Sequence, residues 1–184
     1  MNEVLTPSHR LNASSEIDGR VDIAVSRSTL GWVVVAGTVR GVKAIEFGAT
    51  SEDGIARLRV RFPAANADGS DSATNDWASQ VASFIDAPGS GLDLPLDVRG
   101  TAFEQRVWQA LREIPPGTTA SYGEVARRVG DGATAQEVAQ ACAANVIAVA
   151  IPCHRVVRSD GRLGGYRWGY GRKRALLRRE AKAA

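Results

Sequence analysis

The residues best suited to chemistry are a thiol and an imidazole that directly follow a proline, at Pro152-Cys153-His154. A thiolate is a soft nucleophile, and an adjacent imidazole or a basic setting favours it over the thiol. The preceding apolar run, 147–151, predicts a buried strand that holds the thiol in one place. Neighbouring side chains of an extended segment point to opposite faces, so contact between Cys153 and His154 requires a bent backbone or a bridging water. The pattern indicates a cysteine nucleophile, and a small buried packing residue is the alternative.

The remaining cysteine and histidine restrict the chemistry further. Cys142 lies in an alanine-rich segment, where a packing role is expected. Two cysteines and two histidines are too few for a disulfide framework or a structural zinc site, so no metal and no other cofactor is expected. The polar segment Met1–Arg20 lacks the apolar stretch of a secretory signal, and no apolar run is long enough to span a membrane. We therefore expect a cytoplasmic protein.

Charge is distributed unevenly along the 184 residues. The net charge is only +3, but residues 1–100 carry 9 basic and 13 acidic side chains, whereas residues 101–184 carry 14 basic and 7 acidic ones. A solvated charge run is the usual explanation of a basic segment. Beside a candidate nucleophile, contact with a polyanion such as DNA is a competing explanation.

The elements that position the nucleophile fall into two groups. Three strands, predicted over 21–27, 32–36 and 42–47, form a small antiparallel meander. Two helices are predicted to follow, over 52–61 and 76–85, and then a last strand or an extended connection over 92–98. We expect a flexible leader over 1–20, an α/β support domain over 21–92 and a second domain over 93–184.

The second half contains three Ser/Thr-x-x-Glu capping boxes, in which a hydroxyl and a carboxylate each satisfy a free backbone N–H at a helix start. They begin at Thr101, Ser121 and Thr134. The first opens a helix to about Glu113, and the other two open short helices, 121–129 and about 134–144, joined by a glycine-containing turn. This pattern predicts a helix-turn-helix. Its second helix is mostly alanine, which suits either a packed core helix or one pressed into a DNA groove.

A basic helix is predicted over 172–183, after a glycine-rich aromatic loop at 164–169. Glu180 stands alone among basic residues of this helix. A surface ion pair of little energetic value is its default role.

These residues resemble a known family. The segment IPCHRVV at 151–157 is similar to the active-site motif of O6-alkylguanine-DNA alkyltransferases, the methylated-DNA–protein-cysteine methyltransferases. The similarity continues through RGTAFEQRVWQALREIPPGTTASYGEVA, GYRWG and LLRREA, and it is closest to the C-terminal half of Ada-type proteins. It is strong after residue 98 and loose over the rest of 20–184. The resemblance implies an α+β fold: a ribonuclease-H-like sheet-and-helix domain, then a mostly helical domain with the helix-turn-helix.

The resemblance also implies a single-turnover reaction in which Cys153 takes the alkyl group from O6-alkylguanine in double-stranded DNA, with O4-alkylthymine left open as a second base. His154 would act through a water as the base, and Glu180 would orient the imidazole. Tyr122 would donate a hydrogen bond to the guanine, and Asn145 would hold the turn between the recognition helix and the strand. The substrate pocket would be lined by the backbone of Val156 and by Gly165, Tyr166, Arg167 and Trp168.

DNA would be bound through the minor groove with the damaged nucleotide rotated out of the stack. The residues implied to contact DNA are Thr134, Ala135, Gln136, Ala139, Gln140 and Arg155. Gln136 stands where the family usually places an arginine, which predicts slower repair or weaker DNA binding because glutamine lacks the charge and the planar guanidinium. The Cys and His zinc ligands of some relatives are missing from this sequence. We expect a monomer that is associated with the nucleoid of a bacterial-type cell and has no membrane partner.

Two other functions remain as alternatives. The helix-turn-helix alone is compatible with a damage-sensing transcriptional regulator of Ada type. The Cys-His-Glu set is compatible with a hydrolase that turns over repeatedly on an acyl substrate. One alkyl group accepted per chain would distinguish the transferase from both.

Overall fold

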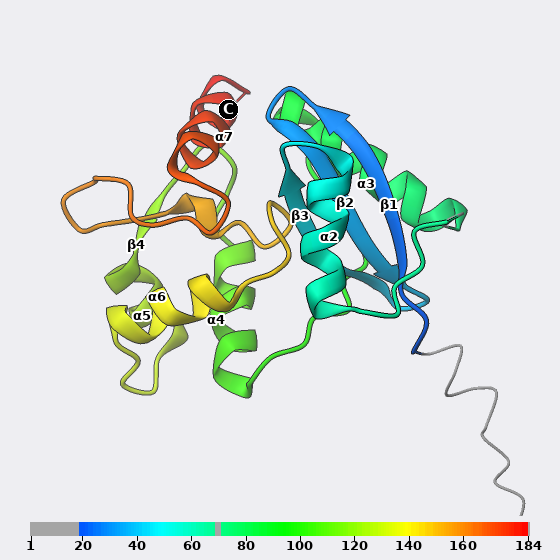
Figure 1. Ribbon diagram of the computed structural model, residues 1–184. Coiled ribbons are helices and arrows are strands. Elements are labelled where there is room, and N and C mark those ends of the chain that lie inside the picture. Colours follow the sequence, from blue (N-terminus) through cyan, green and yellow to red (C-terminus); the bar gives the residue numbers. More distant parts are fainter. Residues whose placement is uncertain (1–18, 69–70, 184) are drawn as a thin grey trace, which may run out of the picture.

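The fold begins with a three-stranded antiparallel sheet, as seen in a computed structural model that describes residues 19–68 and 71–183 (Figure 1). The strands are β1 (Asp22–Ser28), β2 (Gly31–Thr38) and β3 (Gly41–Gly48), in that spatial order. The central strand is apolar from Trp32 to Ala36 because both faces of the sheet are covered. Val33 and Val35 face the main core, whereas Val34 and Ala36 face a smaller cluster around Leu58.

Helices α2 (Ser51–Arg61) and α3 (Ser72–Asp86) supply these two covers. Leu58 of α2 packs in the smaller cluster, and Val81 and Ile85 of α3 pack in the main core. Helix α3 starts four residues before the predicted 76, because Asp71 caps it by accepting the Thr74 N–H at 2.7 Å.

An extended connection leads from the sheet to the second half after the single turn η1 (Pro88–Ser90). It runs beside β3: Val42 N–H donates to Pro95 O (2.8 Å), and Asp97 N–H donates to Val42 O (2.9 Å). Of the two predictions for 92–98, the connection is therefore correct, with one bridge between Val42 and Leu96.

The second half is mostly helical. Its elements are α4 (Ala102–Arg112), β4 (Ala120–Ser121), α5 (Tyr122–Val129), α6 (Ala135–Ala144), η2 (Cys153–Arg155), β5 (Val156–Val157) and α7 (Tyr170–Ala183). All three predicted capping boxes form, at Thr101, Ser121 and Thr134. Helices α5 and α6 pack against each other across the glycine turn, and α4 is fixed to α6 by Trp108 Nε1–H donating to Ala141 O (2.8 Å). The predicted fold class, a small sheet followed by helices, is confirmed.

The two halves share one core, because the main hydrophobic cluster contains residues from β1 through α7. Ile45 N–H of β3 donates to Val146 O at 2.9 Å, directly after α6. Helix α7 returns to the sheet half, where Arg172 Nε donates to Leu30 O (3.0 Å) and Arg179 Nη1 to Ile85 O (2.7 Å).

The predicted division at residue 92 stays a prediction, and most of the leader predicted over 1–20 lies outside the described residues. Among the described helices, none is both long enough and apolar enough to cross a membrane.

Candidate active site

The segment before the nucleophile is a series of tight turns, so the prediction of a buried strand over 147–151 is wrong. Ile147 makes one bridge to Ile45, and the chain then folds back with Ile151 N–H donating to Ile147 O at 3.1 Å. Val149 has a φ of 69°, a left-handed conformation that is unusual for a β-branched residue. An apolar run that packs on every side has the same pattern whether it is extended or turned, which is why periodicity misassigned it.

Asn145 clamps this turn to the nucleophile. It is fully buried at the end of α6, where its Nδ2 donates to Ile151 O (2.9 Å) and to Cys153 Sγ (3.3 Å). Its Oδ1 accepts the Ile147 N–H at 2.8 Å. One amide therefore fixes the start of the turn, its end and the thiol, using both donor and acceptor groups as a buried amide must.

His154 and Glu180 form a buried pair behind the thiol. Cys153 and His154 begin the single turn η2, which supplies the bent backbone that their adjacency requires. His154 Nε2 lies 2.9 Å from Glu180 Oε1. Because a carboxylate accepts hydrogen bonds only, Nε2 carries the proton and Nδ1 is left as an acceptor. Nδ1 is buried and has no hydrogen-bond partner among the described residues, so it is available to a bridging water.

Arg155 completes this pair on its other side. Its guanidinium donates to both oxygens of Glu180, from Nε to Oε2 and from Nη2 to Oε1, each at 2.9 Å. Nη1 also donates to Ile114 O at 2.6 Å. The ion pair is almost fully buried, with 7% and 1% of the two side chains exposed. Glu180 is thus a buried bidentate partner and not the surface ion pair that is its default role.

The protonation states follow from burial and these contacts. Burial lowers the pKa of His154 even though Glu180 opposes the shift, so the imidazole is neutral and can accept a proton. Burial alone raises the pKa of Glu180, but the hydrogen bonds from His154 and Arg155 lower it to about 2. Burial raises the pKa of the Cys153 thiol to about 11, against the opposing effects of Asn145 and Lys173. The resting group is a thiol, which needs a base to react.

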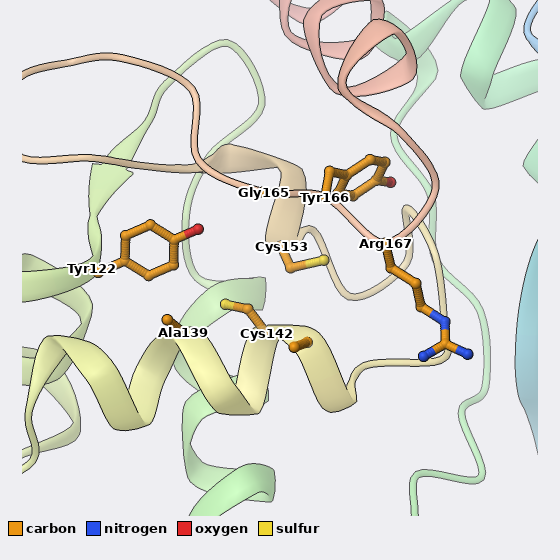
Figure 2. Close-up of a pocket in the computed structure, with 8 residues that line it drawn as sticks. Tyr122, Ala139, Cys142, Cys153, Gly165, Tyr166 and Arg167 are labelled. Carbon is orange, nitrogen blue, oxygen red and sulfur yellow. The ribbon is translucent and has the colours of Figure 1, made fainter.

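Cys153 faces a cavity of about 370 Å³ between α6 and the loop before α7 (Figure 2). The lining residues are Tyr122, Ala139, Cys142, Ala143, Cys153, Gly165, Tyr166 and Arg167. The hydroxyl of Tyr122 points into this space from α5, and the sulfur of Cys142 points into it from α6. Burial raises the pKa of Tyr122, so its hydroxyl is protonated and can donate a hydrogen bond.

Lys173 ties α7 to β5 and to the loop at Gly165 that lines this cavity. It is fully buried, and its Nζ donates to Val156 O (2.6 Å) and to Gly165 O (3.4 Å). Burial lowers the pKa of Lys173, while the nearby thiols Cys153 and Cys142 act in the opposite direction. The ammonium thus supplies a positive charge close to the position where a thiolate would form.

Comparison with known proteins agrees with this geometry. A family model described as "6-O-methylguanine DNA methyltransferase, DNA binding domain" matches residues 102–182. The inducible methylated-DNA–protein-cysteine methyltransferase of Bacillus subtilis is 34% identical over 126 residues, which cover 68% of this chain and 70% of that protein. The chain belongs to the methylated-DNA–protein-cysteine methyltransferase family.

Two further members are similar over most of this chain. The "Bifunctional transcriptional activator/DNA repair enzyme Ada" of Escherichia coli K12 is 47% identical over 162 residues, covering 88% of this chain and 46% of that protein. The crystal structure of Mycobacterium tuberculosis OGT in complex with DNA has a TM-score of 0.74 and 34% identity, covering 89% of this chain and 95% of that chain. The chain spans about half the length of the curated relatives it matches first, from 46% to 56%.

In this family member the predicted DNA contacts separate into two sets. Thr134, Ala135, Gln136 and Gln140 are exposed on the first turns of α6, and Ala139 lies between them and the cavity. Arg155, in contrast, is buried with all three of its guanidinium nitrogens bonded inside the protein. Its predicted contact with DNA is therefore corrected: the side chain holds Glu180 and the Ile114 carbonyl, just after α4, instead.

The five predicted pocket residues also fall into two groups. Gly165, Tyr166 and Arg167 line the cavity that Cys153 faces, whereas Val156 and Trp168 are not among its described lining residues and their roles stay predictions. The Val156 carbonyl is occupied by Lys173, and Trp168 is 3% exposed behind Tyr166, with ring centroids 5.1 Å apart.

Sequence reasoning missed Lys173, Cys142 and Gly164. Lys173 is one of many basic residues in α7, and only its helical spacing of seven from Glu180 shows that the two share a face. Cys142 was expected to be a packing residue, whereas it lines the cavity. Gly164 passes so close to Tyr122 that an added Cβ would lie 2.6 Å from the hydroxyl, which explains a glycine there.

Proposed function

We propose that this chain repairs DNA by moving the alkyl group of O6-alkylguanine irreversibly onto Sγ of Cys153. The observation that carries the proposal is the Cys153 thiol at the wall of a cavity, clamped by Asn145 and backed by the His154–Glu180 pair. The thiol is 5% exposed, so a substrate reaches it only through that cavity. A base inside a duplex cannot do so, and the damaged nucleotide must leave the stack.

The reaction requires a proton transfer and one displacement. A water between the two groups carries the Cys153 proton to His154 Nδ1, and Glu180 stabilises the resulting imidazolium. The thiolate attacks the alkyl carbon as the C–O6 bond breaks, and the bonding electrons leave on the guanine. The protonated Tyr122 donates a hydrogen bond to the base as this negative charge develops, and the base ends the reaction as guanine after it takes up a proton. Sγ keeps the alkyl group, so each chain reacts once.

The exposed first turns of α6 are the proposed DNA-binding surface. Small side chains such as Ala135 and Ala139 let the helix approach a narrow groove, and Thr134, Gln136 and Gln140 supply hydrogen-bonding groups. The M. tuberculosis relative crystallised with DNA supports this partner. The bacterial relatives of this chain support a cytoplasmic, nucleoid-associated location. We also propose that the chain acts as a monomer.

Mass measurement of the Cys153 peptide after incubation with a duplex containing O6-methylguanine tests the proposal. We expect a gain of one CH₂ on that peptide, one per chain, with unmodified guanine left in the DNA. Cys153→Ala abolishes the transfer, and the matched variant Cys142→Ala keeps it because that second cavity thiol is not clamped by Asn145. Absence of any mass gain in the parent would refute the transferase, and repeated turnover on an acyl ester would favour the hydrolase.

A further inference from the structure

A second hollow in the surface lies outside the cavity, between α7 and the hairpin that follows β5. The hairpin closes through Arg158 N–H donating to Arg162 O (2.9 Å) and through a bridge between Val157 and Leu163. In Figure 1 it projects from the helical half on the side away from the sheet. The hollow has a volume of about 520 Å³. We call it the arginine groove after four of its lining residues, Arg158, Arg162, Arg174 and Arg178.

The positive charge of the arginine groove is largely uncompensated. Arg174 and Arg178 are exposed at i, i+4 positions of α7, and in the described part of the chain neither side chain has a hydrogen-bonding or ionic partner. Asp160 is the acidic residue that faces the hairpin arginines, 4.0 Å from Arg158 and 3.5 Å from Arg162. Four guanidinium groups against one carboxylate repel one another, and this arrangement attracts a polyanion.

One loop of the chain leads from the arginine groove to the cavity that Cys153 faces. Leu163 lines the groove, and Gly165, two residues further along, lines the cavity. A nucleotide strand that delivers a base to Cys153 must continue past one edge of that cavity. Arginine binds phosphate oxygens through paired N–H groups, and phosphates repeat along a strand as these guanidinium groups do along the groove.

We propose that the arginine groove binds the phosphate backbone of the DNA strand that flanks the extruded nucleotide. This proposal rests on the proposed function, and it extends the DNA-binding surface beyond α6 to the hairpin and α7. The contacts are to phosphates, so they add affinity and salt dependence without sequence preference.

The number of phosphate contacts is measured by the slope of log K for DNA binding against log salt concentration. Fluorescence anisotropy with a short unmodified duplex gives K at each salt concentration. Each phosphate contact contributes about 0.9 to the slope, so Arg174→Gln/Arg178→Gln should reduce its magnitude by about 2. Arg59→Gln/Arg61→Gln removes the same net charge from exposed positions of α2 and should leave the slope nearly unchanged. Arg174→Lys/Arg178→Lys keeps the charge and should keep the slope.

Asp160→Asn provides a test of opposite sign. Asp160 Oδ1 accepts the Arg162 N–H at 3.0 Å, and an asparagine can accept the same hydrogen bond, so the hairpin is preserved. Loss of the carboxylate should tighten DNA binding and steepen the salt dependence.

Equal slopes for the groove double variant and the α2 control would overturn the proposal. The proposal would also be overturned if the groove double variant lost binding to polyglutamate while its DNA slope equalled that of the parent. That result would assign the groove to an acidic polypeptide. Alkylation of Cys153 by the free base O6-benzylguanine, which has no phosphate, should be equal in all variants. Absence of a mass gain on the Cys153 peptide after the parent is incubated with the O6-methylguanine duplex would refute the proposed function, while the slopes still judge the groove.

Discussion

The buried carboxylate of Glu180 makes a quantitative prediction about acid stability. Its pKa falls from an ordinary 4.5 to about 2 in the folded protein. A carboxyl group with a depressed pKa stabilises the fold fully above its unfolded pKa, and this contribution is lost as the pH falls toward the folded pKa. A difference of about 2.5 pKa units corresponds to about 3 kcal/mol, lost between about pH 5 and pH 2.

Glu180→Gln isolates this contribution. At pH 7 the variant should be less stable than the parent by about 3 to 5 kcal/mol, because Arg155 is left buried without its carboxylate. The difference should shrink by about 3 kcal/mol as the pH falls to about 2, since the parent then loses its own carboxylate. His154, whose pKa is lowered by burial, also costs stability when it is protonated. Because Glu180 opposes that shift, the cost is larger in the Glu180→Gln variant and offsets part of the decrease in the difference.

Urea unfolding at a series of pH values measures these differences. Glu113→Gln, at an exposed position after α4, is the matched control and should stay within about 0.5 kcal/mol of the parent. The double variant Arg155→Met/Glu180→Gln should cost less than the sum of the single variants, because no unpaired buried charge remains. A difference between parent and Glu180→Gln that stays constant from pH 7 to pH 3 would refute the reasoning.

Three other substitutions test separate parts of the site. Asn145→Ala should destabilise the fold by about 1 to 3 kcal/mol, because it leaves the Ile147 N–H unsatisfied. It should also slow alkyl transfer by more than the fraction of unfolded protein explains, and an unchanged transfer rate would contradict the role of Asn145 as a clamp. Lys173→Met should slow iodoacetamide labelling of Cys153 near neutral pH, with the gap closing as the pH approaches the thiol pKa; a pH-independent gap would show a purely structural lysine. Gln136→Arg should speed transfer from duplex DNA but not from free O6-benzylguanine, and an equal or slower duplex rate would refute the role given to this position.

The sequence predicted best what depends on local chemistry. Each capping box requires only a hydroxyl and a carboxylate three residues apart, so Thr101, Ser121 and Thr134 located three helix starts correctly. Family resemblance then selected Cys153 and His154 from residues whose spacing alone left several roles open.

The errors arose where a role depends on distant partners. Arg155 reads as a surface arginine until Glu180, 25 residues later, and Ile114, 41 residues earlier, are placed beside it. The turn at 147–151 depends on the Asn145 side chain, which no hydrophobic period reports. Lys173 looked like any other charge of a basic helix, because its burial is decided by β5 and the loop at Gly165.

Helix α7 links the reactive thiol to the cooperativity of the whole chain. On one side it supplies Glu180 and Lys173 to the active site, and on the other Arg172 and Arg179 bond to the sheet half across 142 and 150 residues of sequence. Contacts of such long range form late in folding and open together. A partly folded chain with α7 detached lacks Glu180 beside His154, so the proposed base for Cys153 is not held in place. The ability of Cys153 to accept an alkyl group therefore reports that the native fold is complete. Substitutions in the sheet that release this helix should therefore lower the reactivity of Cys153, although they lie far from the proposed DNA-binding surface.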